Sequence, residues 1–429
     1  MGPVERLRAA AREPWAPFAL LAVVCVLSVA ARTAWLSDPC ANPCRGESAH
    51  SLIFDEVYYV NAARRIDSIP VPRGQHYSGT PAGQDPNSEH PQLVKLIIAG
   101  AIDLFGDGPF AWRIGSVIFG TLAILGMFAL ACASGASRWC ALLAATLMAA
   151  DNLMLVAGRI GTLDIYVVAF MVWAGALYLW GHPIGAGVVL GVGTTAKEVA
   201  PYLLLVLGLV ELVHHRRAVL REAGPALAAC TAVAGASYLA LLALFDRIAP
   251  PYDPQTGSTI RGGPIAHTEH MLSYAAGLTS PHGLTGIASY PWDWLVDLKP
   301  ILYLNVTVTV GRSATSTVHF LGFISPPILL FGLIGLVVAG VAVVRRTAPV
   351  GVVAVAWFAG TWLPFAALSL FFQRTSYLYY MVIVMPGIYL AAARLLCLPR
   401  MPRWGLWLFM VLVLAAAVLT YPFLPVPEL

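Results

Sequence analysis

Charged side chains are scarce in this sequence. Asp, Glu, Lys and Arg make up only 11% of its 429 residues, whereas hydrophobic residues make up 59%. A soluble domain carries about 25% charged residues, so this chain has too few to cover a surface that faces water. The composition therefore excludes an ordinary soluble protein and predicts an all-α protein that crosses the membrane several times.

The sequence also lacks a basic stripe and a cleavable leader. Its net charge is only +4, without interleaved basic and aromatic residues, so we expect no nucleic-acid partner. The first apolar run, "WAPFALLAVVCVLSVAARTAWL", follows three arginines and lacks a clear small-x-small cleavage site before Asp38. We interpret it as a retained signal anchor. No internal repeat or soluble segment interrupts the chain, and we expect residues 1–429 to form one membrane domain.

Cysteine is rare, and only one pair suggests a cross-link. Five of the seven cysteines lie in or beside apolar segments, where they are expected to be small buried hydrophobic residues. Cys40 and Cys44 instead lie in the polar stretch "DPCANPC", where a local disulfide and two free thiols both stay open. No second cysteine pair has metal-ligand spacing, so we expect no metal site.

The basic residues that are present predict the topology. They concentrate at the N-terminus and in "HHRRAVLR" (214–221), "RR" (345–346) and "RLLCLPRMPR" (394–403), which the positive-inside rule places in the cytoplasm. This pattern fits eleven apolar spans with a cytoplasmic N-terminus and two large outer loops, 37–112 and 247–319. The spans are 16–36, 113–131, 139–156, 162–180, 184–197, 199–213, 224–246, 320–344, 349–371, 377–393 and 404–424.

Successive loops must alternate between the two sides of the membrane. With the basic clusters in the cytoplasm, this charge parity requires that residues 91–106 do not cross the membrane. This segment is short and carries Lys95 and Asp103, so we expect an interfacial helix on the outer leaflet. If it crossed, every later loop would change sides and the basic clusters would face outward.

Four cations then end up at the outer ends of predicted spans: Arg113, Arg159, Lys197 and Arg374. One interpretation is that they extend to the interface or form ion pairs that orient the bundle. The other is that together they bind an anionic head group, because Arg and Lys supply several charge-assisted donors to a phosphate.

The adjacent acids Asp55 and Glu56 begin the stretch "DEVYYVNAARRI" in the first outer loop. Its apolar spacing predicts an amphipathic helix, whose dipole favours acids at the start. A carboxylate there can also serve as a general base toward a hydroxyl. Neighbouring helical side chains point about 100° apart, so we expect at most one of the two to do the chemistry.

Histidines and aromatic residues mark the rest of the outer loops. His90, in "EHPQLVK", is expected to cap or orient the interfacial helix. His267 and His270 have H-x-x-H spacing, but no further ligand lies in register and a metal is not expected. The segment "SYPWDWL", with Trp292, predicts either a sugar-stacking face or an aromatic anchor at the membrane interface.

Six motifs in this order give the chain its resemblance to a known family: "FDEVYY" (54–59), "EHPQLVKLIIA" (89–99), "FGDGPFAWRIGSVIFGTL" (105–122), "DNLMLVAGRIGTLD" (151–164), "HMLSYAAGLTSPHGLTGIASYPWDWL" (270–295) and "QRTSYLYY" (373–380). The sequence resembles the protein O-mannosyltransferases, and among them the actinobacterial members. The resemblance implies a GT-C type membrane glycosyltransferase that transfers mannose from a polyprenyl-phosphate carrier to Ser or Thr hydroxyls on the outer side.

The resemblance also implies roles for individual residues. Asp55 corresponds to the favoured catalytic base, with Glu56 beside it, and Arg113 helps to hold the carrier phosphate. We expect Lys197, Arg159 and Arg374 to assist at the phosphate. The remaining expected site residues are His90, Lys95, Asp164 and Tyr58, which shape the site, and His270, His282 and Trp292, which contact acceptor or sugar.

Two departures leave the substrates open. The family usually has H-P-P-L-G-K where this chain has "HPQLVK", and a tryptophan where this chain has Glu198. One alternative is therefore a GT-C enzyme whose acceptor is a lipid or cell-wall glycan, or whose sugar is not mannose. A lipid-carrier transporter is a second alternative, which the clustering of charges at the outer ends disfavours.

The expected mechanism inverts the sugar and needs no cofactor or metal, because protein cations stabilise the leaving phosphate. Expected partners are the lipid-linked sugar, a secreted protein or glycan, membrane lipids and the secretion machinery. The expected location is the plasma membrane, with the active site outside the cell.

Overall fold

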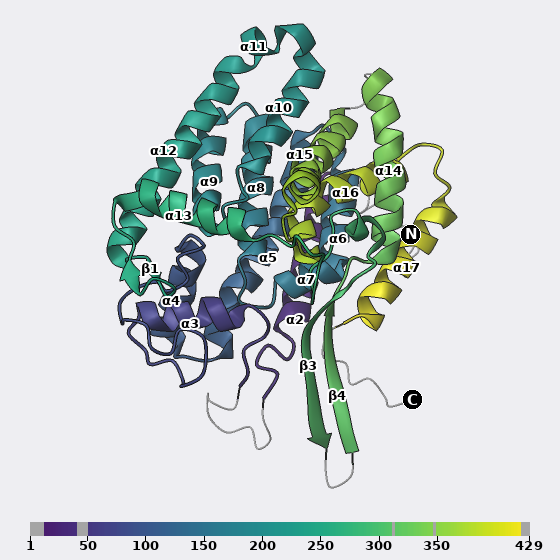
Figure 1. Cartoon of the computed structure of the whole chain (residues 1–429). Coiled ribbons are helices and arrows are strands. Elements are labelled where there is room, and N and C mark those ends of the chain that lie inside the picture. Colours follow the sequence, from purple (N-terminus) through teal and green to yellow (C-terminus); the bar gives the residue numbers. More distant parts are fainter. Residues whose placement is uncertain (1–12, 41–49, 311–313, 346–348, 422–429) are drawn as a thin grey trace.

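Eleven helices form the body of the protein. The computed structural model describes residues 13–40, 50–310, 314–345 and 349–421, without the side chains of residues 305–319 and 345. The eleven correspond one to one with the predicted spans. They are α2 (Ala16–Thr33), α5 (Pro109–Ala133), α6 (Arg138–Ala150), α8 (Asp164–Leu179), α9 (Pro183–Ala196), α10 (Tyr202–His215), α12 (Gly224–Ile248), α14 (Pro326–Arg345), α15 (Pro349–Phe372), α16 (Met381–Leu396) and α17 (Arg403–Leu419) (Figure 1).

The predicted membrane protein is confirmed in its main features. Six of these helices, within the described part of the chain, are long and apolar enough to cross a membrane. Four others are apolar but have only 10–17 residues. The total of eleven crossings therefore stays a prediction.

Most of the smaller elements lie at the end of the bundle that carries the two large loops. The helical ones there are α3 (Glu56–Ile66), α4 (Leu93–Phe105), α7 (Asn152–Ala157), α13 (Gly263–Gly277), η3 (Asp293–Val296) and η4 (Leu378–Tyr380), whereas η2 (Arg216–Ala218) and α11 (Val219–Glu222) lie at the other end. α4 has 13 residues, as α6 does, so its interfacial position stays a prediction from the charge-based topology.

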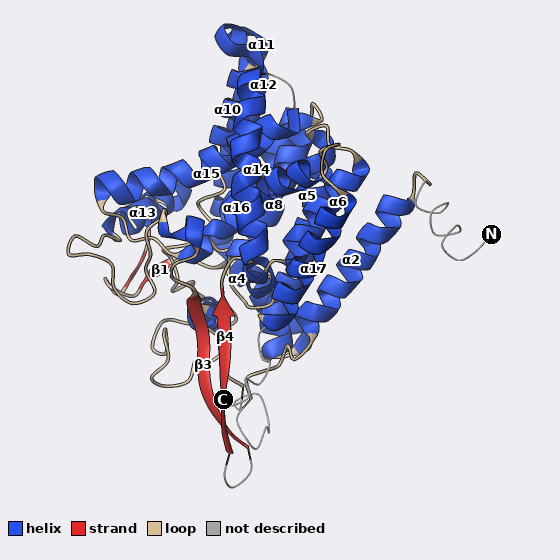
Figure 2. Ribbon diagram, turned by 90° about the vertical axis from the view of Figure 1, so that its right-hand side faces the viewer, coloured by secondary structure: helices blue, strands red, loops and turns tan. Residues whose placement is uncertain are grey.

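The described part of the chain is mostly helical, as expected for the all-α class, and it also contains two strand pairs that were not predicted. A short antiparallel pair joins β1 (Tyr252–Asp253) to β2 (Ser258–Thr259). A longer pair joins β3 (Ile301–Val310) to β4 (Ala314–Gly322), with Ile301 opposite Gly322, and it projects well beyond the helices (Figure 2). The alternating, β-branched run "NVTVTV" is the sequence signal for this hairpin.

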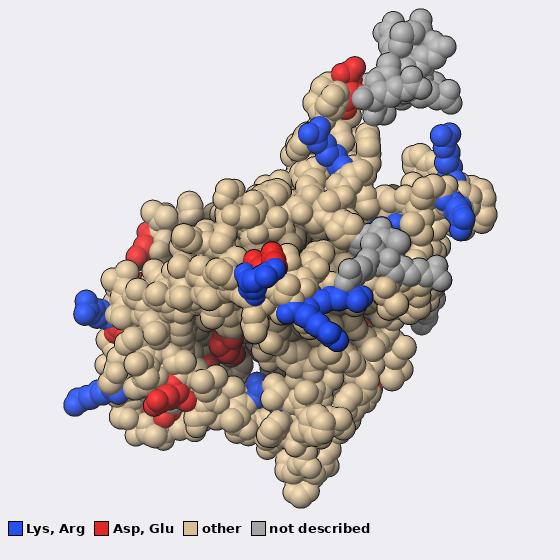
Figure 3. Space-filling model, turned by 90° about the horizontal axis from the view of Figure 1, so that it is seen from above, with Lys and Arg blue, Asp and Glu red and all other residues tan. Residues whose placement is uncertain are grey.

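Basic residues lie at the end of the bundle opposite α3, α4 and the β3–β4 hairpin. The turn between α10 and α12 and the segment between α16 and α17 both lie at this end (Figure 1). Arg216, Arg217 and Arg221 are exposed there. Figure 3, which views this end, shows a mostly uncharged surface with scattered Lys, Arg, Asp and Glu groups. The orientation of this end toward the cytoplasm stays a prediction of the charge-based topology.

Glycines set the contact between α9 and α12. A Cβ added at Gly187 would lie 2.6 Å from the Cys230 carbonyl oxygen, and one at Gly191 would lie 2.7 Å from the Ala234 carbonyl oxygen. The two glycines are four residues apart and so share one face of α9. Small residues at this spacing let two membrane helices approach closely, which dispersion forces then stabilise.

We expect Gly191→Ala to lower the thermal unfolding midpoint of the detergent-solubilised protein, because the new methyl group forces α12 away. Overpacking of this kind costs about 1–3 kcal/mol. Gly185→Ala is the matched control on the same helix, since the nearest atom to its added Cβ is 3.9 Å away. Equal midpoints for the two variants would contradict this account of the contact.

Candidate active site

Asp55 stands at the start of α3 with its carboxylate free. The preceding residue, Phe54, has a φ of 53°, a backbone conformation that bulky residues rarely adopt. Its ring packs against Tyr303 and Tyr379, with centroids 4.6 Å and 5.9 Å away. No described residue donates a hydrogen bond to the Asp55 carboxylate or forms an ion pair with it. Backbone strain of this kind is found most often at functional sites.

Glu56, in contrast, is completely buried and fully bonded. Its carboxylate receives two hydrogen bonds from Arg113, from Nε at 2.8 Å and Nη2 at 2.9 Å. It also accepts the backbone N–H groups of Ile53 at 2.7 Å and Gly161 at 2.8 Å. Glu56 therefore ties α3 to α5 and to the loop before α8, and no lone pair is left for a substrate.

Arg113 and Arg159 do not line the cavity that holds Asp55. Besides binding Glu56, Arg113 donates to the backbone carbonyls of Leu36, Asp38 and Ser51. Arg159 donates to Tyr421 Oη at 3.1 Å and to backbone carbonyls at the end of α2. The structure thus gives both arginines the orienting role that the charge pattern left open, and does not bring them to the predicted phosphate site.

Asp55 opens into a cavity of about 320 Å³. Three other predicted residues, Tyr58, His90 and Arg374, line it with Asp55. The remaining lining residues are Phe54, Tyr59, Asn87, Glu89, Glu198, Tyr274, Ala275, Leu278, Ile287, Tyr377, Tyr379 and Tyr380. Carboxylates and tyrosine rings dominate this lining, a composition suited to a polyhydroxylated group.

Cations in and behind the cavity differ in their partners. Lys197 is buried and bonds Asp164, with Nζ and Oδ1 2.5 Å apart, under the rings of Tyr379 and Tyr380. Arg374 lines the cavity itself, and its Nη1 has no hydrogen-bond partner. It forms no ion pair with any described residue. Arg374 is therefore the cation best placed to receive an anion.

The surroundings of the cavity shift the pKa values of Asp55 and Glu198 in opposite directions. Burial and the nearby Asp164 raise the pKa of Asp55 from 3.8 to about 7, against the opposing effect of Lys197 and His90. Burial also disfavours ionised Glu198, but His90 and Lys197 outweigh it and lower its pKa from 4.5 to about 2. Near neutral pH, Asp55 can exchange a proton, whereas Glu198 stays charged.

Buried polar contacts fix the loop that carries Asn87, Ser88, Glu89 and His90. Lys95 Nζ lies 2.5 Å from the carboxylate of Asp85 and donates to the carbonyls of Asn87 and His90. His267 lies 2.8 Å from Asp246 through Nδ1 and 3.0 Å from the Ser88 carbonyl through Nε2. Both histidines of the H-x-x-H motif thus help to hold this loop, because His270 Nε2 also lies 3.2 Å from Ser88 Oγ.

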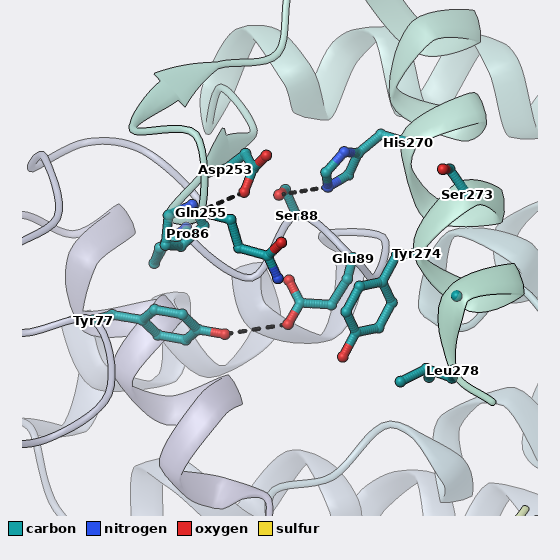
Figure 4. A pocket seen from close by; sticks show the side chains of 12 residues that line it. Tyr77, Pro86, Ser88, Glu89, Asp253, Gln255, His270, Ser273, Tyr274 and Leu278 are labelled. Atoms are coloured by element: carbon teal, nitrogen blue, oxygen red, sulfur yellow. Dashed lines mark hydrogen bonds between the residues drawn. The ribbon is translucent and has the colours of Figure 1, made fainter. Parts of the chain in front are cut away.

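A second cavity of about 540 Å³ adjoins the first (Figure 4). The two share Glu89, Tyr274 and Leu278 as lining residues. Figure 4 shows Tyr77 directed at Glu89, with its hydroxyl 3.4 Å from the carboxylate, and His270 opposite Ser88. His270 lines this second cavity while it contacts Ser88, and its contact with an acceptor stays a prediction.

The other two expected contacts lie elsewhere. His282 is exposed in the loop after α13, and Trp292 is 42% exposed and stacked on Tyr290 with ring centroids 4.7 Å apart. Neither lines either cavity. The proposed pairing of Cys40 with Cys44 cannot be followed, because Cys44 lies outside the described residues.

Sequence reasoning missed several residues of the site. Glu89 was not assigned although it directly precedes His90, and Asp246 was not assigned either. Tyr274 and Tyr377 sit in the quoted motifs but carry no charge to single them out. The chemistry of these residues becomes visible only when the fold brings distant loops together.

The fold is that of the GT-C membrane glycosyltransferases. The Pmt1-Pmt2 protein O-mannosyltransferase complex of S. cerevisiae, solved with its sugar donor, aligns with a TM-score of 0.66 at 14% identity, over 94% of this chain and 89% of that one. ArnT from Cupriavidus metallidurans, bound to undecaprenyl phosphate, gives 0.56 at 17% identity, over 94% and 64%. The oligosaccharyltransferase of Archaeoglobus fulgidus gives 0.60 at 14% identity, over 97% and 57%.

The similarity in sequence is more specific than the similarity in fold. Residues 89–240 match the family model described as dolichyl-phosphate-mannose-protein mannosyltransferase. A polyprenol-phosphate-mannose–protein mannosyltransferase of Mycolicibacterium smegmatis is 26% identical, over 92% of this chain and 83% of the relative. One of the same name from Corynebacterium glutamicum is 25% identical, over 69% and 68%. The resemblance inferred from the motifs is confirmed, and the match to the family model starts after Asp55.

Opposite effects on stability are expected from substituting the two adjacent acids. Glu56→Gln leaves Arg113 buried without its counter-charge, which typically costs about 3–5 kcal/mol. Asp55→Asn should unfold at the same temperature as the wild type or higher at pH 8, because the raised pKa means that folding disfavours the ionised Asp55.

The pH dependence provides the check on this pair. The unfolded carboxyl titrates near 3.8 and the folded one near 7, so any gain from Asp55→Asn is full above pH 7 and shrinks as the pH falls toward 4. Thermal unfolding of both variants in detergent measures this. Equal destabilisation by the two substitutions would show that Asp55 also has a structural bond.

Proposed function

We propose that this chain is an inverting glycosyltransferase that moves mannose from a polyprenyl-phosphate carrier to Ser or Thr hydroxyls of secreted proteins. The single observation that carries the proposal is an unbonded carboxylate, Asp55, in one cavity with an arginine that lacks an anionic partner, Arg374. The names of the mycobacterial and corynebacterial relatives support mannose and a protein acceptor.

The donor phosphate binds at Arg374 in this proposal, with Lys197 contributing positive potential from behind Tyr379 and Tyr380. A guanidinium group offers several donors in the geometry that phosphate oxygens accept. Neutralising the phosphate makes the lipid phosphate a better leaving group, which is the electrostatic part of the catalysis. The solved relative with undecaprenyl phosphate supports a lipid phosphate as a ligand of this fold.

Asp55 acts as the general base. Its carboxylate takes the proton of the acceptor hydroxyl while the hydroxyl oxygen attacks the anomeric carbon and the bond to the phosphate oxygen breaks. Attack opposite to the leaving phosphate inverts the anomeric centre. A pKa of about 7 suits this role, because general bases work best when their pKa lies near the operating pH.

The acceptor reaches Asp55 through the second cavity, which meets the first at Glu89, Tyr274 and Leu278. At about 540 Å³ it has room for a side chain with its flanking backbone. Both cavities lie at the end of the bundle away from the basic clusters, which supports an extracytoplasmic active site in the plasma membrane. The same proposal includes coupling of this protein to the secretion machinery, because the proposed acceptor is a secreted protein.

Asp55→Asn is expected to reduce transfer from polyprenyl-phosphate mannose to a Ser/Thr-rich peptide by about 10²–10⁴-fold, the usual contribution of a general base. In the wild type, kcat/KM should rise with pH up to about 7 and then level off, because only ionised Asp55 accepts a proton. The residual rate of Asp55→Asn should lack this rise. Near wild-type transfer by Asp55→Asn would overturn the assignment, and transfer only to lipid or glycan acceptors would replace the protein acceptor.

Arg374→Gln is expected to weaken binding of polyprenyl phosphate by about 10- to 150-fold, the worth of a hydrogen bond to a charged group. Titration of the solubilised protein with polyprenyl phosphate measures the change. Arg261→Gln is the control, since Arg261 is an exposed arginine in the same outer region. Equal affinities for the two variants would remove Arg374 from the phosphate site.

A further inference from the structure

His90 and Glu198 form a pair across the wall of the cavity that contains Asp55. Nδ1 of His90 lies 3.1 Å from Oε2 of Glu198, and both residues line the cavity. Their side chains keep 21% and 22% of their surface exposed. The pair is therefore a bonded unit that still presents polar atoms to whatever occupies the cavity.

Both members are held in place from behind. The carbonyl of His90 accepts a hydrogen bond from Lys95 Nζ at 2.8 Å, and Lys95 is itself fixed by Asp85. Glu198 follows directly on Lys197, whose ammonium group is bonded to Asp164. A rigid carboxylate loses little conformational entropy when it binds a ligand, which favours selective recognition.

The charge of Glu198 limits what it can bind. An ionised carboxylate accepts hydrogen bonds but cannot donate them, and it repels a phosphate. Of the groups that the proposed reaction brings to this cavity, the phosphate fits Arg374 and the acceptor hydroxyl fits Asp55. The hydroxyl groups of the sugar are the remaining donors, and they suit a fixed carboxylate.

The size and the remaining lining agree with a sugar. About 320 Å³ is near the lower end of the volumes of ligand pockets, roughly 300–1,000 Å³, so the cavity suits a head group better than a peptide. Tyr59 and His90 lie with ring centroids 6.1 Å apart, and Tyr377 stacks on Tyr379 at 5.2 Å. Aromatic faces beside a carboxylate match the apolar faces and polar edges of a hexose.

We propose that the His90–Glu198 pair binds hydroxyl groups of the glycosyl unit and so determines which sugar the protein transfers. This inference rests on the proposed function, because it presumes a lipid-linked sugar in the cavity. It assigns a specificity role to the residue that stands where the resembling family has a tryptophan.

Binding measurements test the proposal without relying on activity. Glu198→Gln should bind polyprenyl-phosphate mannose about 10- to 100-fold more weakly than the wild type does, because a charged hydrogen-bond acceptor is lost. It should bind polyprenyl phosphate, which has no sugar, no more weakly than the wild type. Loss of affinity for both ligands, or for neither, overturns the proposal.

A matched control comes from the other end of α10. Glu211 and His215 form the same kind of pair, with Nε2 and Oε2 3.2 Å apart, far from the cavities. Glu211→Gln should leave both affinities unchanged. If Glu211→Gln weakens mannose-donor binding as much as Glu198→Gln does, the effect is structural and the proposal fails.

Competition between two donors provides the second readout. The ratio of kcat/KM for polyprenyl-phosphate mannose and polyprenyl-phosphate glucose should move toward one in Glu198→Gln and in His90→Phe, by about 10-fold or more. An unchanged ratio overturns the proposal. A wild-type protein that transfers neither sugar to a peptide contradicts the proposed function instead, whereas the binding comparison still decides the role of Glu198.

Discussion

The buried ion pair between Arg113 and Glu56 is the interaction on which the rest of the site depends. Two charges away from water are tolerable only when their hydrogen bonds are satisfied, and here four donors meet the Glu56 carboxylate. The pair clamps the start of α3 to α5 and to the backbone at Gly161. Asp55, one residue earlier, is thereby held at the cavity without a bond to its own side chain.

Several of the few charged residues of this chain form ion pairs around the cavity that contains Asp55. Asp85 with Lys95 and Asp164 with Lys197 are buried pairs around the same cavity, one fixing a loop and the other supplying potential. A low-dielectric setting strengthens such interactions and penalises any unpaired charge. At the cavity, the raised pKa of Asp55 and the unpartnered Nη1 of Arg374 mark places where this penalty is left uncompensated.

The sequence was sufficient to predict the bundle and part of the site. Long apolar runs locate helices because burial in lipid demands them, and charge parity predicts that α4 does not cross the membrane. The motifs single out Asp55, His90, Tyr58 and Arg374, and the structure brings these residues together in one cavity. Arg113 lies outside that cavity, because Glu56 already occupies its donors, which its motif does not reveal. The β3–β4 hairpin was missed because its alternation lies within a loop that charge parity alone defined.

The hydrogen bonds of Glu56 have a consequence for how this sequence can vary. A substitution that removes the charge of Glu56 leaves the guanidinium group of Arg113 buried without its counter-charge. We therefore expect residues 56 and 113 to change together in evolution or to stay unchanged. Position 55 is under no such constraint, since none of the described residues is bonded to its carboxylate. Under the proposed function, we expect the substrate to constrain position 55, whereas the fold constrains position 56.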